Sequence, residues 1–317
     1  MSQTSNNVKA AIDIGSNSIK MRVGRCVGGR IEVLADTTEV VRLGRGFVDG
    51  GIAGRTMENA LRVVTGMVSR ARGMGADIRL VGTMALRVAS NAGEFLSRIR
   101  EATGLEVQVV SGEDEARYAW RGAVGDRSLP SGEAPSDGDI VMFDTGGGST
   151  EFVFGRREGP LRIQSVPVGA VSLTERFLDA APARQSAIDA ATRYVADLFR
   201  ENGIARRDPA VAPAVLGLGG GVVAMASVKI RAEEFLPVKL HGMELTRRDL
   251  TQQIRLYSML TVEERRNVVG LPPSRADAVL ASACIVLCAL KALEVPSCRL
   301  SINGLRHGVL MEMCENC

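Results

Sequence analysis

The sequence predicts an α/β protein with two domains of similar construction. Strand-like and helix-like patterns alternate along the chain, as is typical of α/β layering. A unit of apolar strand, aspartate, glycine-rich turn and second strand occurs twice, at Asp13 and at Asp144. The 317 residues, 45% of them hydrophobic, suffice for a core in each domain. We therefore expect two similar domains whose glycine turns face one interdomain cleft.

The first domain is expected to span residues 1–125, with a C-terminal helix at 305–317 packing back onto it. It begins with two apolar runs joined by a Gly/Ser/Asn turn, a pattern that predicts two paired strands. The predicted elements, in chain order, are strands at 8–14 and 19–23, a helix at 55–72, a strand at 78–82, a helix at 91–101 and a strand at 106–110.

The second domain is expected to span residues 126–304. It starts with DRSLPSGEAPSDGD, at 126–139, which is rich in Pro, Gly, Ser and acids and is typical of a linker. Beyond it the pattern of the N-terminus starts again. The predicted elements are strands at 140–144 and 151–154, a helix at 184–201, a strand at 214–218, a long helix starting near 275, and a last short segment at 300–302 before the terminal helix.

Composition excludes several classes of function. The chain has 39 Lys and Arg against 36 Asp and Glu, a net charge of +3, so no basic field indicates a nucleic-acid partner. The N-terminus lacks the basic and apolar regions of a secretory signal, which favours a cytoplasmic protein. The longest apolar run, 278–290, is shorter than the roughly 20 residues that cross a bilayer, so we expect a buried helix and no membrane contact.

The six cysteines are expected to be free thiols, because thiols are normally kept reduced in the cytoplasm. Cys284 and Cys288 share one face of the apolar helix, and Cys314 and Cys317 form a terminal CxxC without a second pair. A metal or redox role for either pair is the alternative, but buried cysteine usually acts as a small hydrophobe.

The turn after Asp13 carries the residue types of an anion site. Successive backbone N–H groups in a glycine turn can form an anion-binding nest, and a carboxylate can hold Mg²⁺ directly or through water. A hairpin turn with Asx-type hydrogen bonds is the alternative. The candidate phosphate-binding residues of this turn are Gly15, Ser16, Asn17 and Ser18.

The turn after Asp144, in DTGGGSTE, repeats the arrangement. Three consecutive glycines are costly in chain entropy, which favours phosphate contact over a flexible hairpin. The candidate phosphate-binding residues of this turn are Gly146, Gly147, Gly148, Ser149 and Thr150.

Six motifs in order resemble one known family. They are DIGSNS, TMALRVASN, SGEDEA, DTGGGSTE, RADAVLASA and NGLRHG, and together they cover the chain from residue 10 to about 310. The chain resembles the exopolyphosphatase and guanosine pentaphosphatase family, within the sugar kinase, heat-shock-70 and actin superfamily. The resemblance implies two actin-like, ribonuclease H-like domains, in the short form that lacks the further C-terminal domain of long relatives.

The resemblance implies that Glu115, in SGEDEA, is the base that activates water. The residues are compatible with this, because Ser111 can cap a helix whose first turn is acidic and whose N-terminus favours ionised carboxylates. Acidic capping of a surface helix is the alternative. The resemblance further implies that Arg87 lies across the phosphate chain, where a guanidinium can bond to phosphate oxygens, and that Lys20 assists.

The implied metal is Mg²⁺, with Mn²⁺ as the alternative, held by Asp13, Asp144 and Glu151. Glu151 also stands beside the attacking water in this interpretation. Arg275 is a secondary phosphate-binding candidate, with pairing to Asp277 as the alternative.

Four residues lie outside the catalytic pattern or depart from the family pattern. His241 and His307 are expected to serve structure, and GLRHG stands where many relatives have GLREG. Gly220 and Gly221 replace the Gly-Thr found in relatives, which weakens any claim of nucleotide specificity.

The predicted reaction is Mg²⁺-dependent release of the terminal phosphate from inorganic polyphosphate, with short chains as the first choice. Hydrolysis of guanosine pentaphosphate to the tetraphosphate would use the same residues. An ATP-dependent kinase for a small acceptor and a non-catalytic sensor of guanosine tetraphosphate are the alternatives from other classes. A homodimer is expected, as is common among soluble enzymes.

Overall fold

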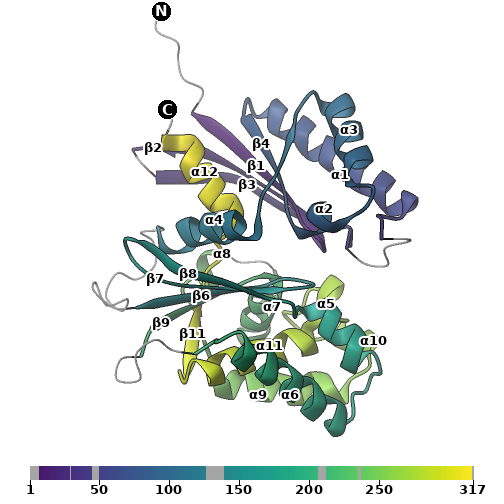
Figure 1. The fold of residues 1–317 in the computed structure, drawn as a ribbon, viewed down its shortest axis with the longest axis vertical. Coiled ribbons are helices and arrows are strands. Elements are labelled where there is room, and N and C mark those ends of the chain that lie inside the picture. Colours follow the sequence, from purple (N-terminus) through teal and green to yellow (C-terminus); the bar gives the residue numbers. More distant parts are fainter. Residues whose placement is uncertain are drawn as a thin grey trace, which may run out of the picture. The chain divides into compact units, whose positions relative to one another are not determined.

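A computed structural model describes residues 7–28, 30–44, 50–125, 139–205, 212–234 and 237–315 of the chain. The chain divides into two compact units (Figure 1). Unit 1 comprises Met1–Gly122 and Asn303–Cys317, and unit 2 comprises Ala123–Ile302. The linker predicted at 126–139 lies, apart from Asp139, outside the described residues.

Unit 1 is built on a five-stranded sheet with the order β3-β2-β1-β4-β5. The first three strands form an antiparallel meander, and β4 and β5 run parallel to β1. The carboxyl ends of β1, β4 and β5 therefore meet at one edge of the sheet. The strands are β1 (Val8–Ile14), β2 (Ser18–Val27), β3 (Arg30–Val40), β4 (Asp77–Gly82) and β5 (Val107–Val109).

The helices of unit 1 cover this sheet. In α1, buried apolar side chains recur every three or four residues from Met57 to Ala71, which gives the helix one face toward the core. The C-terminal helix α12 packs on β1 and β2 although it comes from the far end of the chain. The helices are α1 (Gly54–Gly73), α2 (Met84–Val88), α3 (Ala92–Thr103), α4 (Gly112–Val124) and α12 (Leu305–Glu315).

Unit 2 repeats the plan with a six-stranded sheet, in the order β10-β11-β9-β6-β7-β8. Strands β6, β7 and β8 form an antiparallel meander, and β9 runs parallel to β6, as β4 does to β1. The predicted α/β class with two sheets is therefore confirmed. The strands are β6 (Ile140–Thr145), β7 (Thr150–Arg156), β8 (Gly159–Val166), β9 (Ala214–Leu218), β10 (Glu244–Thr246) and β11 (Ser297–Leu300).

The helix α11 forms the centre of the helical layer of unit 2. Twelve of its residues, Val279 through Leu290, are buried, and it packs against α6, α7 and α9 (Figure 1). The prediction of a buried helix at 278–290 is therefore confirmed. The helical elements are α5 (Ala170–Leu173), η1 (Thr174–Leu178), α6 (Gln185–Glu201), α7 (Gly220–Lys229), α8 (Pro237–Leu240), α9 (Arg247–Met259), α10 (Val262–Arg265), η2 (Pro273–Arg275) and α11 (Val279–Ala292).

Among the described residues, none of the helices combines the length and the apolar character that a membrane crossing requires.

The expectation that all cysteines are free thiols is wrong for two of them. Cys26 on β2 and Cys314 on α12 form a disulfide, with their Cα atoms 5.7 Å apart. The two residues are 288 positions apart in sequence, so only the packing of α12 on β2 brings them together. In the described part of the chain, Cys284, Cys288 and Cys298 are free and buried. Burial raises the pKa of the Cys288 thiol to about 11 and that of Cys298 to about 12.

Candidate functional site

The turn after β1 in unit 1 is tight and closely supported. The N–H of Gly15 donates to the carbonyl of Ser18 at 3.1 Å, and the N–H of Gly44 donates to the carbonyl of Ser16 at 2.8 Å. Since the C=O and N–H of a trans peptide point in opposite directions, the N–H of Asn17 points away from Gly44. The predicted anion-binding turn therefore presents at least this amide on the side opposite to its support.

Asp13, directly before this turn, is a buried carboxylate with an unsatisfied oxygen. Its exposed fraction is 7%, and among the described residues Oδ1 has no hydrogen-bond partner. Oδ2 lies 3.9 Å from Nζ of Lys20, its cross-strand neighbour. Burial raises the pKa of Asp13, against the opposing effect of Lys20 and Arg306. A buried, unpaired carboxylate oxygen is a site that a cation or a proton would stabilise.

Arg87 and Glu115 form an ion pair in unit 1. Nη1 of Arg87 donates to Oε2 of Glu115 at 3.0 Å and to the carbonyl of Val110 at 2.8 Å. Both side chains are about one quarter exposed. Ser111 accepts from the N–H of Asp114 at 3.0 Å, which confirms that it caps α4. The Glu115 carboxylate is therefore held in one orientation, with access to solvent.

The sheet of unit 1 brings these groups to one edge. Ile14 pairs with Gly82, and Gly82 pairs with Val109, all in parallel register. The segments that follow these strands carry the turn of Gly15, Arg87 on α2, and Glu115 on α4. In open α/β sheets this carboxyl edge is where ligands bind. Sequence reasoning named these residues separately, and the structure of unit 1 places them along a single edge.

The turn after β6 in unit 2 repeats the geometry of unit 1. The N–H of Gly146 donates to the carbonyl of Ser149 at 2.9 Å. The carbonyls of Gly146 and Gly147 accept from Ala170 and Val171 at the start of α5, at 2.9 and 2.8 Å. By the same peptide geometry, the N–H groups of Gly147 and Gly148 point away from α5. These are the amides that this turn presents.

The acidic pair of unit 2 lies across two strands. Asp144 on β6 is the register partner of Glu151 on β7. Glu151 is 9% exposed, and its Oε1 accepts from the hydroxyl of Ser165 on β8 at 3.0 Å. Thr150 is fully buried, and its hydroxyl donates to the carbonyl of Val168 at 2.6 Å. This bond anchors the end of the turn to the segment that follows β8. Sequence reasoning missed Ser165, because no local signal marks a serine on an edge strand.

The glycine run after β9 packs against Asp144. Gly219 has φ of 101°, and a Cβ there would lie 2.6 Å from the carbonyl oxygen of Thr145 and 2.9 Å from Oδ1 of Asp144. Only glycine fits this approach. The N-terminus of α7, which begins at Gly220, is therefore held close to the Asp144 carboxylate.

Arg275 lies against Gly220. A Cβ on Gly220 would come within 2.2 Å of Nη2 and 2.4 Å of Cζ of Arg275, so the guanidinium occupies the space that a side chain would fill. Burial lowers the pKa of Arg275, and Asp277 opposes this. Arg275, Gly219 and Asp144 thus form one surface with the N-terminus of α7, a location that favours anions. Sequence reasoning had made Arg275 a secondary candidate.

The candidate metal ligands are divided between the units, with Asp13 in unit 1 and Asp144 and Glu151 in unit 2. In neither unit do three His, Cys, Asp or Glu side chains of the described part gather closely enough to hold a metal by themselves. The donor type nevertheless fits a hard cation, because Asp13 has an unpaired buried oxygen. A cation at this residue would complete its coordination with water or phosphate oxygens.

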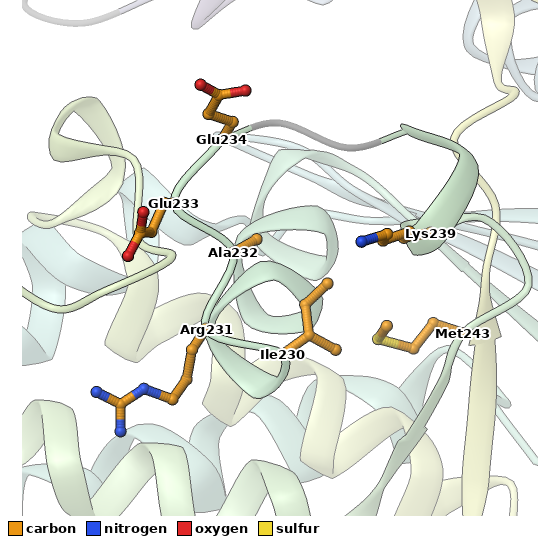
Figure 2. A pocket seen from close by; sticks show the side chains of 7 residues that line it. All are labelled: Ile230, Arg231, Ala232, Glu233, Glu234, Lys239 and Met243. Carbon is orange, nitrogen blue, oxygen red and sulfur yellow. The ribbon is translucent and has the colours of Figure 1, made fainter.

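A hollow of about 600 Å³ lies at the C-terminal end of α7, beyond Lys229. Figure 2 shows Ile230 and Met243 at its apolar side, with Lys239 also facing it and Glu234 turned away. The ten residues of α7 separate this hollow from Gly220 by about 15 Å, given a rise of about 1.5 Å per residue. It is therefore distinct from the phosphate-type turns.

His307 is part of a polar cluster in unit 1. Arg22 bonds to Asp36 on β3, to Asn303, and to Nδ1 of His307, the last at 3.3 Å. Arg306 also pairs with Asp36. The cluster joins the C-terminal segment to the sheet. His307 contacts this buried arginine and so belongs to the structural cluster, as expected from the sequence.

Comparison with known proteins identifies the relatives of the chain. Residues 22–317 match the model of the Ppx/GppA phosphatase family. A guanosine-5'-triphosphate,3'-diphosphate pyrophosphatase of Photobacterium profundum is 28% identical over 310 residues, which are 96% of this chain and 59% of that protein. The chain thus spans 59% of the length of this curated relative.

Solved structures agree with this match. A Ppx/GppA family member of Aquifex aeolicus superposes with a TM-score of 0.81 at 27% identity, over 98% of both chains. An exopolyphosphatase of Cytophaga hutchinsonii superposes with a TM-score of 0.85 at 24% identity, over 98% of both chains, and supports the fold alone.

The fold and the two aspartate-led turns define an α/β protein with two candidate phosphate-binding turns. The family model covers nearly the whole chain, and the chain belongs to the Ppx/GppA phosphatase family.

Proposed function

We propose that the protein hydrolyses the terminal phosphoanhydride bond of inorganic polyphosphate, with water as the acceptor. The observation that carries the proposal is the edge of unit 1, where Arg87 orients Glu115 beside strand ends that include Asp13, whose buried Oδ1 has no hydrogen-bond partner among the described residues. An ionised carboxylate with solvent access can accept a proton from water. Glu115 is the base in this proposal.

Phosphoryl transfer needs positioning and charge neutralisation more than covalent chemistry. Asp13 in unit 1, and Asp144 and Glu151 in unit 2, are the proposed ligands of Mg²⁺, with Mn²⁺ as the alternative. When bound, the cation would neutralise charge on the phosphate.

The proposed phosphate contacts come from residues of each unit. Lys20 supplies a positive charge in unit 1, and Arg275 supplies one in unit 2. Backbone N–H groups contribute without charge, as in other anion-binding turns. The candidate residues of the two turns are Gly15, Ser16, Asn17, Ser18, Gly146, Gly147, Gly148, Ser149 and Thr150. Among them, the N–H groups of Asn17, Gly147 and Gly148 point away from the contacts that support each turn, whereas those of Gly15 and Gly146 donate within the turn.

Guanosine pentaphosphate is the second candidate substrate. The name of the relative from Photobacterium profundum favours it, since that name refers to the guanosine compound. Hydrolysis of its terminal phosphate would use the same groups. The cytoplasmic location and the homodimer expected from the sequence belong to the same proposal.

The test is phosphate release by the purified protein with Mg²⁺, measured on short polyphosphate, long polyphosphate, guanosine pentaphosphate and ATP. Glu115→Gln should lower kcat about 10²–10⁴-fold with little change in KM. Glu113→Gln is the matched control, because Glu113 lies in the same helical turn but pairs with Arg117. Equal kcat for the two variants would reject Glu115 as the base. Transfer of phosphate from ATP to a small acceptor, in place of release into water, would favour a kinase, and binding without turnover would favour a sensor.

A further inference from the structure

Arg265 is a fully buried arginine that the proposed reaction does not use. Its exposed fraction is 1%, and it ends α10 in the interior of unit 2. Within the described part of the chain, its Nη2 has no hydrogen-bond partner. A buried guanidinium with an unsatisfied donor costs free energy, and apolar side chains often replace such groups without loss of stability. Its presence therefore requires a reason other than stability.

The hydrogen bonds of Arg265 join two segments. Nε donates to the carbonyl of Tyr257, in the last turn of α9, at 2.8 Å. Nη1 lies 3.4 Å from the carbonyl of Ala276, which directly follows Arg275. Ala276 is itself fully buried. Arg265 thus connects the end of α9 to the backbone that carries Arg275.

Side-chain hydrogen bonds connect Tyr257 in turn to α7. The hydroxyl of Tyr257 donates to Oε1 of Gln253 at 2.8 Å, and Nε2 of Gln253 donates to the carbonyl of Met225 in α7 at 2.9 Å. Gln253 and Tyr257 are buried. These contacts run from α7 through Gln253, Tyr257 and Arg265 to the backbone directly after η2. They form a closed ring, because the Arg275 guanidinium of η2 lies against Gly220, the first residue of α7.

Asp277 supplies the charge balance for both arginines. Burial lowers the pKa of Arg265 and of Arg275, and the Asp277 carboxylate opposes this in each case. A guanidinium group stays protonated in proteins, so the two arginines are buried cations that share one nearby anion.

We infer that Arg265 is a positioning residue, which fixes the η2 backbone so that the Arg275 guanidinium lies at the N-terminus of α7, ready to contact a phosphate. This inference rests on the proposed function, because it assigns Arg275 a phosphate ligand. Arg265 itself touches no phosphate and acts only through Arg275.

The experiment is a double-mutant cycle on anion affinity. Binding of inorganic tripolyphosphate is measured by isothermal titration calorimetry in Mg²⁺ buffer for the full chain, Arg275→Met, Arg265→Met and the double variant. Loss of a charge-assisted bond at Arg275 should weaken binding about 10- to 100-fold. Arg265→Met should weaken it about 5- to 20-fold, since misplacement of a ligating group by about 1 Å is costly. The double variant should bind within about 2-fold of Arg275→Met, because both changes remove one interaction.

Arg247→Met is the matched control. Arg247 is a partly buried arginine, also with an unpaired nitrogen among the described residues. It lies at the start of α9, the helix whose last turn Arg265 contacts, and donates to the carbonyl of Leu290. It should lower thermal stability and leave tripolyphosphate affinity within about 2-fold of the wild type. If Arg265→Met does not fold, Arg265→Lys is measured, since an ammonium group keeps the charge but lacks the fork that reaches both carbonyls.

The negative results distinguish failure of the positioning role of Arg265 from failure of the proposed function. Wild-type affinity in the Arg265 variant, an equal loss in the Arg247 control, or multiplicative losses in the double variant overturn the positioning role and leave the proposed function intact. If the wild-type protein neither binds tripolyphosphate nor releases phosphate from any substrate, the proposed function fails and this inference fails with it.

Discussion

The contact between Gly220 and Arg275 allows one substitution to separate function from folding. In Gly220→Ala, the new methyl group would lie 2.2 Å from Nη2 and 2.4 Å from Cζ of Arg275. Ordinary contacts between such atoms are about 3.5–4.0 Å, so the guanidinium must retreat by more than about 1 Å. The obstacle is the mobile end of a side chain, and the helix position tolerates alanine, so we expect the variant to fold.

This displacement of the Arg275 guanidinium should weaken its contact with phosphate and slow phosphate release. A displacement of about 1 Å from the productive geometry can cost about 10²-fold in rate. We therefore expect kcat/KM for phosphate release from tripolyphosphate to fall about 10- to 100-fold in Gly220→Ala, with the melting temperature within a few degrees of the wild type. Steady-state kinetics and thermal unfolding monitored by circular dichroism measure the two quantities.

The neighbouring glycine provides the contrast. In Gly219→Ala, the methyl group would lie 2.6 Å from the backbone carbonyl oxygen of Thr145, at φ of 101°. A non-glycine residue in such a conformation costs about 1–3 kcal/mol. Each kcal/mol lowers the melting temperature of a 150–250-residue domain by about 2–4 °C. Wild-type kinetics in Gly220→Ala, or equal destabilisation by both substitutions, would refute the reasoning.

Three further predictions follow from contacts within unit 1. Burial would raise the pKa of Asp36, but its two arginine partners outweigh burial and lower it below the ordinary value of 3.8. The Asp36 carboxylate therefore stabilises the fold above about pH 4 and loses this effect as the pH falls through the lowered pKa. Asp36→Asn should flatten the acid limb of the stability profile in urea titrations, and an unchanged limb would contradict the assignment. Reduction of the Cys26–Cys314 disulfide should lower the unfolding free energy by about 2–4 kcal/mol, seen as a lower urea midpoint with dithiothreitol, whereas identical midpoints would exclude the bond. Arg87→Met should lower kcat about 10²–10³-fold at unchanged melting temperature, and retained kcat would show that Glu115 needs no orienting partner.

The regular parts of the fold were predictable because their signals are local. Buried strands such as β1 and β6 have continuous apolar runs, and the amphipathic period of α1 marks its whole length. The edge strands β3 (Arg30–Val40) and β8 (Gly159–Val166) were missed, since neither has a continuous apolar run and much of their surface is exposed. The long helix begins at Val279 rather than near 275, because Pro273–Arg275 form a 3₁₀ turn first.

The candidate site was predictable as a set of residues but not as a geometry. The sequence identified Asp13 and Glu115 through their motifs. It contained no signal for the unpaired oxygen of Asp13, for the Arg87–Glu115 ion pair, or for the contact of Arg275 with Gly220. Each of these depends on segments that are distant in sequence and adjacent only in the folded unit. The disulfide was missed for the same reason.

The assignment of residues 303–315 to unit 1 has a consequence for biosynthesis. Unit 2 consists of one continuous stretch of chain, so all of its residues have been translated once Ile302 is added. The sheet of unit 1 is translated before unit 2, yet the helix that covers β1 and β2 is translated after it. During synthesis, the apolar surface beneath α12 therefore remains uncovered until unit 2 has been translated, and this surface is where nascent chains of the protein would need protection from aggregation.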